Sequence, residues 1–289
     1  MEKLDFLAIG DTTIDAFIRL KEASVHCDIN KANCQICMSF GDKIPYDFVE
    51  VVPAVGNSAN ASVSAAKLGL SSALLANVGG DQKTNYHYVL WYEDERTILV
   101  KHQPFSYALP ALPEIGWLYL SSLGENSLEY HGEILEYLKA HPDTKLVFQP
   151  GTFQMKFGYK ALENLYRRTH LFICNTDEAR RILDTKEEDI MKLLEELKEA
   201  GPEIVLITDG PKGAYAYDGN EAWFMPPYPD PMPPLQRTGA GDAFASTVAV
   251  ALALGKPLDE ALRWGPINSM SVVQQIGAQK GLLTREALE

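Results

Sequence analysis

The sequence predicts an α/β protein whose mainly parallel central sheet is covered by helices on both faces. Short apolar runs, typical of buried strands, alternate with amphipathic or Ala-rich helical segments from residue 4 to residue 275. Further β-rich stretches near 15–20, 47–53 and 85–102 should join as a small projecting lid. The chain has 289 residues, of which 46% are hydrophobic, enough for one large domain over 1–289.

The composition excludes several classes of protein. A net charge of −13 without a Lys/Arg stripe argues against a nucleic-acid binder. The chain lacks a basic-then-apolar start and an apolar run of about 18 residues, so we expect a cytoplasmic protein without a membrane partner. Four cysteines in a chain of this length do not make a disulfide scaffold.

The strands and helices are predicted from local pattern. Buried strands are expected at 4–9, 73–78, 116–121, 145–149 and 171–174, with another beginning at Ile204, because each is a short apolar run that ends at Gly, Asp, Asn or Pro. An antiparallel pair is expected at 214–217 and 222–225. Helices are expected at 57–68, 128–139, 187–200, 245–254, 258–264 and 267–275, where the apolar periodicity is helical. The proline-rich segment 226–234 suits neither a helix nor a strand.

The exit of the first strand carries two carboxylates, Asp11 and Asp15. Ligands of open α/β sheets collect at the carboxyl ends of the strands. Both aspartates are therefore candidates for ligand binding, although either is also explained as a loop cap, and for Asp11 the two interpretations are equal.

Cysteine spacing in residues 21–45 suggests a second kind of site. Cys27, Cys34 and Cys37 follow the pattern C-x₆-C-x₂-C, and His26 precedes the first of them. Cys₃His would complete a tetrahedral zinc shell, so a structural Zn²⁺ is one interpretation. Free thiols are the first choice, because no second close pair exists, and a redox pair is a third interpretation.

A Gly-Ala-Gly turn before the apolar segment 245–254 is the centre of the predicted chemistry. A helix that starts at Gly239-Ala240-Gly241 exposes backbone N–H groups at its positive end, which suits a phosphate or an oxyanion. A carboxylate at Asp242 would repel phosphate unless it takes a proton from an attacking hydroxyl. Together these residues indicate phosphoryl transfer to an alcohol.

The segment Thr238-Gly239-Ala240-Gly241-Asp242 resembles the C-terminal signature of the ribokinase/PfkB family of carbohydrate and nucleoside kinases. Further stretches resemble the same family in the same order, namely the strand exit at Asp15, Gly56-x₃-Asn60, Asn175-x₂-Glu178 and Thr208-x-Gly210-x₂-Gly213. The chain departs from the pattern at Val55 and Gln236, where the family has Gly and Asp. Residues 21–45 match weakly, and a family segment after Asp81 is missing.

This resemblance implies a ribokinase-like three-layer α/β/α fold that uses ATP and Mg²⁺. Asp242 would be the catalytic base, and the backbone N–H groups of Gly239, Ala240 and Gly241 would form an anion hole. The implied contacts are Asp11, Asp15, Gly56, Asn57 and Asn60 for the acceptor, Asn175, Thr208, Gly210, Gly213 and Asn268 for the nucleotide, and Asn175 and Glu178 for Mg²⁺ through water.

The acceptor remains open between classes. A sugar or sugar derivative is the first choice, since two aspartates and two asparagines suit vicinal hydroxyls. A nucleoside is the second, with an apolar wall expected from Phe17, Tyr86, Tyr88, Trp91 and Phe105, whereas a sugar phosphate would need Lys43, Arg96 and Lys101. A non-catalytic small-molecule sensor is the alternative outside enzymes. Lid strands in this family often pair between subunits, which implies a homodimer through the lid.

Overall fold

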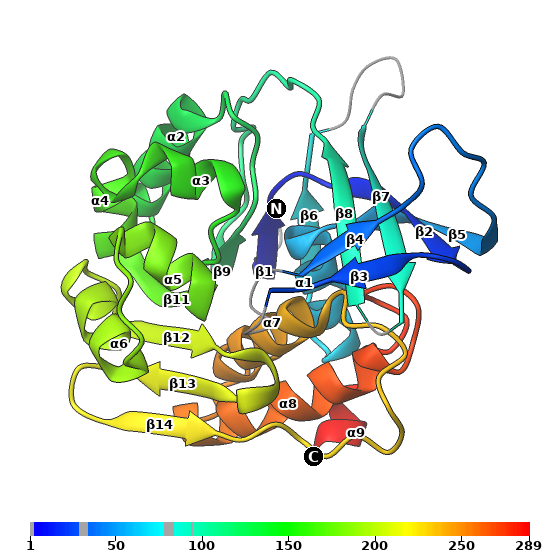
Figure 1. Ribbon diagram of the computed structural model, residues 1–289. Coiled ribbons are helices and arrows are strands. Elements are labelled where there is room, and N and C mark those ends of the chain that lie inside the picture. The colour runs from blue at the N-terminus through cyan, green and yellow to red at the C-terminus, as the bar shows by residue number, and fades with distance from the viewer. Residues whose placement is uncertain (1–2, 29–33, 78–83, 94) are drawn as a thin grey trace.

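The computed structural model describes residues 3–28, 34–77, 84–93 and 95–289 as a large sheet with helices on both faces and a smaller lid sheet (Figure 1). The large sheet has the strand order β14-β13-β12-β11-β10-β9-β1-β6. Its strands are β1 (Leu4–Ile9), β6 (Ser72–Leu75), β9 (Ile115–Leu120), β10 (Lys145–Phe148), β11 (Thr169–Asn175), β12 (Ile204–Thr208), β13 (Ala214–Tyr217) and β14 (Ala222–Met225). All neighbours from β6 to β12 pair in parallel, and β13 and β14 add an antiparallel edge. The predicted fold class is confirmed.

Two apolar clusters explain why helices cover both faces of the large sheet. In β1, Phe6 and Ala8 point to one face while Leu7 and Ile9 point to the other, and all four are buried. Burial on both sides is what makes these strands read as continuous apolar runs. The first face packs against α1 (Asn57–Lys67), α7 (Ala240–Ala253), α8 (Leu258–Val273) and α9 (Arg285–Leu288). The second packs against α2 (Leu128–Ala140), α4 (Tyr159–Arg168), α5 (Thr176–Leu183) and α6 (Ile190–Glu199), and α3 (Thr152–Phe157) lies beside α4.

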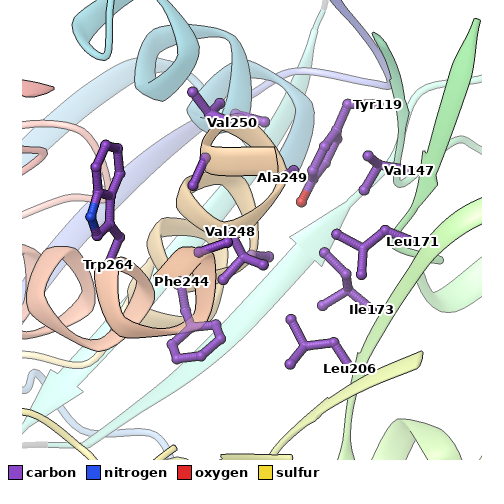
Figure 2. Packing of buried hydrophobic residues seen from close by; sticks show 14 of the residues in the cluster. Tyr119, Val147, Leu171, Ile173, Leu206, Phe244, Val248, Ala249, Val250 and Trp264 are labelled. Atoms are coloured by element: carbon purple, nitrogen blue, oxygen red, sulfur yellow. The ribbon is translucent and has the colours of Figure 1, made fainter. Parts of the chain in front are cut away.

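Helix α7 is the central helix of the first face. Figure 2 shows Val248 and Ala249 between the strand residues on one side and Trp264 of α8 on the other. Each fully buried Val, Leu or Phe of this kind contributes roughly 1.5–3 kcal/mol. This packing holds the N-terminus of α7, which carries Asp242, at the carboxyl edge of the sheet.

The predicted break between helices 258–264 and 267–275 is wrong, because the structure has one helix, α8, with Pro266 inside it. A residue before proline is normally pushed out of the helical region by the contact between its Cβ and the proline ring. Gly265 has no Cβ, and a Cβ placed there would lie 3.0 Å from the Phe244 ring. The small residue therefore permits both the continuous helix and the close packing of α7.

The lid sheet has the order β5-β2-β7-β8. Its strands are β2 (Thr13–Leu20), β5 (Tyr46–Val55), β7 (Asn85–Tyr92) and β8 (Glu95–Lys101). The hairpin β7–β8 and the pair β2–β5 are antiparallel, whereas β2 and β7 pair in parallel. Asp15 and His87 are register partners and share one face, and the opposite face exposes apolar side chains.

The zinc hypothesis is not supported. Cys27 and Cys34, beside the small hairpin of β3 (Ser24–His26) and β4 (Gln35–Cys37), form a disulfide, so their sulfur atoms are not available as thiolate ligands. Cys37 remains free and half-buried. Within the ranges described above, no three His, Cys, Asp or Glu side chains are grouped so as to hold a metal ion. The first choice, free thiols, is correct for Cys37 and wrong for the other two.

Part of the expected lid connection lies outside the described residues. The strand predicted at 73–78 ends at Leu75 in the structure, and the turn at Gly79-Gly80-Asp81, with the missing family segment after it, falls in the range 78–83. Across the described part of the chain, no helix combines the length and apolar character needed to cross a bilayer.

Candidate active site

Three side-chain amides surround the carboxylate of Asp242 in the first turn of α7. Asn57 Nδ2 donates to Oδ1 at 3.0 Å, Asn60 Nδ2 donates to Oδ2 at 2.8 Å, and Gln149 Nε2 lies 3.5 Å from Oδ1. Burial raises the pKa of Asp242, whereas the hydrogen bonds from Asn60 and Gln149 and the charge of Arg96 lower it. The arrangement keeps one carboxylate oriented in a half-buried position, as a proton acceptor requires.

Backbone geometry before Asp242 can be satisfied only by glycine. Gly239 has φ of 84°, and a Cβ there would lie 2.3 Å from Ala278 Cβ. The turn is also held by Gln236, which is 2% exposed. Gln236 Oε1 accepts from Thr238 N at 2.7 Å, and its Nε2 donates to the carbonyl of Gln275 at 2.8 Å. The amide at the position where the family has Asp thus ties the turn to the end of α8.

The predicted anion hole begins α7. The first N–H groups of a helix have no intrahelical carbonyl partner, and the dipole makes this end positive. Ala240 N donates weakly to the Arg237 carbonyl at 3.4 Å. Space beside Gly241 is open, since a Cβ there would meet no atom within 4 Å. An anion can therefore approach this turn closely.

Asp11 has a defined partner in the residues that follow the lid. Tyr107 Oη donates to its Oδ2 at 2.6 Å and accepts from Gly124 N at 2.8 Å. Asp11 is 8% exposed, and its Oδ1 is buried without a hydrogen-bond partner among the described residues. Burial raises the pKa of Asp11 to about 6, against the opposing effect of the Tyr107 hydrogen bond. Asp11 is therefore more than a loop cap.

Asp15 begins a row of rings. Its Oδ1 accepts from Thr13 Oγ1 at 3.2 Å and lies 3.3 Å from His87 Nδ1. The ring of His87 contacts His102, and His102 contacts Phe153 of α3, with centroid distances of 5.6 Å and 5.1 Å. Burial lowers the pKa of His102, and the charges of His87 and Lys156 add to this shift. The lid and α3 therefore present a surface of imidazole and phenyl rings beside Asp15.

Asn175 and Glu178 form a reciprocal capping box at the start of α5. Asn175 Oδ1 accepts from Glu178 N at 2.9 Å, and Glu178 Oε2 accepts from Asn175 N at 2.9 Å. Burial raises the pKa of Glu178, and the charge of Asp242 raises it further. The cap uses one oxygen of each side chain, which leaves Glu178 Oε1 for an ion or a water.

The predicted nucleotide residues separate into two groups. Thr208 ends β12 half-buried, Gly210 begins the short helix η1 (Gly210–Lys212), and Gly213 follows that helix. Packing also requires glycine at position 213, because a Cβ there would lie 2.5 Å from the Met225 carbonyl. Asn268 does not fit the prediction. It is 0% exposed, and its amide is used by Thr247 Oγ1 at 2.7 Å and Leu283 N at 2.9 Å, so it joins α7 and α8 to the C-terminal segment.

Arg96 brings a positive charge from the lid toward Asp242. The charge of Asp242 raises the pKa of Arg96, although burial has the larger, opposite effect. Its Nε is buried without a hydrogen-bond partner in the described ranges. Glu95 lies 3.8 Å from Arg96 and 3.5 Å from Arg237, so one carboxylate bridges the two guanidinium groups.

Several contributors to this site are not identified by the sequence pattern, among them Gln149, Tyr107 and His87. Gln149 was placed only at the end of a strand, although a polar residue directly after a buried run is a signal that would have identified it. Tyr107 and His87 gave no local signal. They reach Asp11 and Asp15 only through the path of the lid.

The chain is similar to known kinases over most of its length. The profile of the pfkB family carbohydrate kinases matches residues 82–285, which is more than half of the chain. The chain belongs to the pfkB family. The kinases of this family are phosphotransferases, so this chain is placed among enzymes.

Individual pfkB relatives differ in their substrates. A ribokinase of Bacillus subtilis is 27% identical over 268 residues, covering 81% of this chain and 86% of that protein. A cytidine kinase of Thermococcus kodakarensis is 33% identical over 118 residues, covering 40% of this chain and 41% of that protein. Among solved structures, a nucleoside kinase of Methanocaldococcus jannaschii has a TM-score of 0.76 at 18% identity and covers 100% of this chain and 97% of its own. A ribokinase of Cryptococcus neoformans in complex with ADP has a TM-score of 0.76 at 20% identity, with 99% and 98% covered.

Proposed function

We propose that this chain transfers the γ-phosphoryl group of ATP to a hydroxyl of a sugar or sugar derivative, with Asp242 as the base. The observation that carries the proposal is the Asp242 carboxylate, held by Asn57, Asn60 and Gln149 at the N-terminus of α7. Such a carboxylate takes the acceptor proton as the phosphoryl group is transferred. The N–H groups at Gly239, Ala240 and Gly241 would stabilise charge on that group.

The charges around Asp242 fit a divalent cation. The pKa of Glu178 is raised by burial and also by the charge of Asp242, and the capping box leaves Glu178 Oε1 available. A cation relieves this repulsion, so Asn175 and Glu178 are the residues that would hold Mg²⁺ through water. When bound, Mg²⁺ would neutralise charge on the ATP phosphates. Thr208, Gly210 and Gly213 would line the nucleotide.

Polar groups for the acceptor lie at the carboxyl ends of the strands and in the lid. Asp11, Asp15, Gly56, Asn57 and Asn60 would hold its hydroxyls. Asp11 Oδ1, buried without a partner in the described part of the chain, is an acceptor site for one hydroxyl. The lid would exclude water, which otherwise competes as an acceptor.

A nucleoside is the second candidate, because the rings of His87, His102 and Phe153 lie in a row that starts at Asp15. A base could stack on this surface while Asp15 binds the sugar. The residues first expected to form that wall fit less well. Phe17, Trp91 and Phe105 are buried, and Tyr86 and Tyr88 are on the outer face of the lid.

The test is ADP formation with ATP and Mg²⁺ against a panel of sugars, nucleosides and sugar phosphates, with Asp242→Asn as the control. Turnover with a sugar that is lost in the control supports the proposal. Turnover with nucleosides alone would favour a nucleoside as the acceptor. Binding of a panel member without any turnover would favour the sensor.

We propose in addition that two copies of the chain pair through the outer faces of their lids. That face exposes Val49, Val51, Tyr88 and Leu99 at 48%, 52%, 49% and 52%. A contiguous apolar sheet face of this kind marks an interaction site. A monomer mass from light scattering, unchanged up to the concentrations used for activity, would contradict it.

A further inference from the structure

Gln279, in the segment that follows α8, uses one side-chain nitrogen to contact two functionally different elements. Its Nε2 donates to the carbonyl of Ala54 at 2.8 Å and to Asn60 Oδ1 at 3.0 Å. Ala54 lies at the end of lid strand β5, and Asn60 binds Asp242. One amide group therefore joins the lid to the residue that orients the proposed base.

The lid end of this contact is a conformationally unusual turn, Ala54–Gly56, which we call the lid junction. Ala54 has φ of 56°, one of three non-glycine residues with positive φ in the described ranges, and Gly56 has φ of 113°. The left-handed region is unfavourable for a residue with a Cβ, so a partner must hold Ala54 there. Gln279 supplies that partner.

The base end of the contact decides which way Asn60 points. The two ends of an asparagine amide have similar size, and only their hydrogen bonds distinguish them. Because Gln279 Nε2 is a donor, it selects the oxygen of Asn60. That choice turns Asn60 Nδ2 toward Asp242 Oδ2, 2.8 Å away. A flipped amide would place an oxygen against the carboxylate and raise the pKa of Asp242.

The backbone of Gln279 is itself anchored to the end of α1. Lys67 Nζ donates to the carbonyl of Leu282 at 2.8 Å and to that of Gln279 at 3.4 Å. Asn57 and Asn60 lie in the first turn of the same helix. The C-terminal end of α1 therefore holds Gln279 through Lys67, and its N-terminal end holds Asn60. Hydrogen bonds connect Gln279 to Asn60 and Asn60 to Asp242.

We propose that Gln279 is a positioning residue that couples the lid junction to Asp242 through Asn60. This inference rests on the proposed role of Asp242 as base. When the junction holds the conformation seen here, Gln279 fixes the Asn60 amide and lowers the pKa of the base. When the junction moves, the Ala54 carbonyl leaves Gln279, and the orientation of Asn60 is less strongly determined.

The experiment compares Gln279→Met with Gln279→Glu. Met keeps the length of the side chain and removes the donor. Glu keeps the shape, removes the donor and adds an acceptor that attracts Asn60 Nδ2 away from Asp242. We expect kcat to fall about tenfold in Gln279→Met and about a hundredfold in Gln279→Glu. The acidic limb of the pH profile of kcat/KM should move up by about one unit, and further in Gln279→Glu. Gln274, whose Nε2 donates to the Met232 carbonyl at 3.0 Å, provides the matched control pair Gln274→Met and Gln274→Glu.

A purely structural role, in which Gln279 only holds the Ala54 carbonyl, also makes Gln279→Glu the more damaging change but leaves the acidic limb of the pH profile unmoved. Equal activity of the two Gln279 variants, an unmoved acidic limb, or loss of folding in Gln279→Glu would each overturn the proposal. Amide hydrogen exchange over residues 53–60 separates this failure from failure of the proposed function. Both Gln279 variants should exchange faster there than the Gln274 controls, whether or not the protein turns over any acceptor, and unchanged exchange would overturn the coupling to the lid junction.

Discussion

Asn60 and Asp242 are 182 positions apart in the sequence and are joined by a hydrogen bond of 2.8 Å from Nδ2 to Oδ2. One residue belongs to the first turn of α1 and the other to the first turn of α7. The two helices pack side by side on the same face of the sheet, so their N-termini meet at its carboxyl edge. The carboxylate that we propose as the base and the amide that donates to it are thereby held on two packed helices.

Asp242→Asn should lower kcat at least about a hundredfold while leaving ATP affinity nearly unchanged, because the amide cannot take a proton. Turnover and nucleotide binding are measured on the same preparation. A variant that retains wild-type turnover would remove Asp242 as the base.

Gly239→Ala should destabilise the fold by roughly 2–4 kcal/mol and abolish activity, because the new Cβ meets Ala278 in a backbone conformation that alanine avoids. Gly241→Ala is the matched control for stability. It is helical with open space around it, so its free energy of unfolding should stay equal or rise by up to about 1 kcal/mol. Denaturant unfolding measures both, and equal effects of the two substitutions would contradict the close packing at Gly239.

Asp11→Asn should stabilise the protein at pH 7.5 and have little effect at pH 4. Burial raises the pKa of Asp11 to about 6, above its ordinary value. The contribution of Asp11 to the free energy of unfolding is therefore fully present at pH values below that ordinary pKa, and it is lost as the pH rises through 6. The gain at pH 7.5 is at most about 3 kcal/mol.

Asp5→Asn is the control of opposite sign. Hydrogen bonds from the Ser71 side chain and backbone lower the pKa of Asp5. Its contribution to the free energy of unfolding is therefore present at pH values above its ordinary pKa and is lost as the pH falls. Thermal melts of both variants at the two pH values give the comparison. The same change in Tm at both pH values for Asp11→Asn would contradict the raised pKa.

Arg96→Gln should move the acidic limb of kcat/KM to higher pH. The charge of Arg96 lowers the pKa of Asp242, so its removal leaves Asp242, the proposed base, protonated over a wider pH range. Arg19→Gln is the lid control, since Arg19 lies over the Trp91 ring and donates to the Glu93 carbonyl. An acidic limb that moves equally in both variants would show that the effect comes from the lid as a whole.

Thiol titration of the denatured protein should find two reactive groups before reduction and four after it. The chain has four cysteines, and the Cys27–Cys34 disulfide removes two of them, 4 − 2 = 2. Four thiols without reductant, together with metal released by a chelator, would restore the zinc interpretation.

Much of this architecture follows from local pattern. The strand Leu4–Ile9 begins and ends at the predicted residues, and the antiparallel pair 214–217 and 222–225 is also confirmed. These succeed because a short apolar run, or an alternation of apolar and polar residues, and the turn residues that flank it act within a few positions. The break predicted at Pro266 is wrong. Gly265 allows α8 to continue through Pro266, and it packs closely against Phe244, which belongs to another helix and is not visible in the local pattern.

The amino-acid sequence by itself determined the alternation of strands and helices, the Gly-Ala-Gly turn and its carboxylate, since each depends on residues close together in the chain. Only the tertiary structure decided which groups surround that carboxylate. Gln149 follows β10 and Asn60 lies in α1, and both reach Asp242 because the sheet order places β9 between β10 and β1. Strand order and the path of the lid depend on the packing of the whole chain, so no local periodicity encodes them. For the same reason Gln279 and Tyr107, which have no motif around them, are recognised only where the folded chain brings them to Asn60 and Asp11.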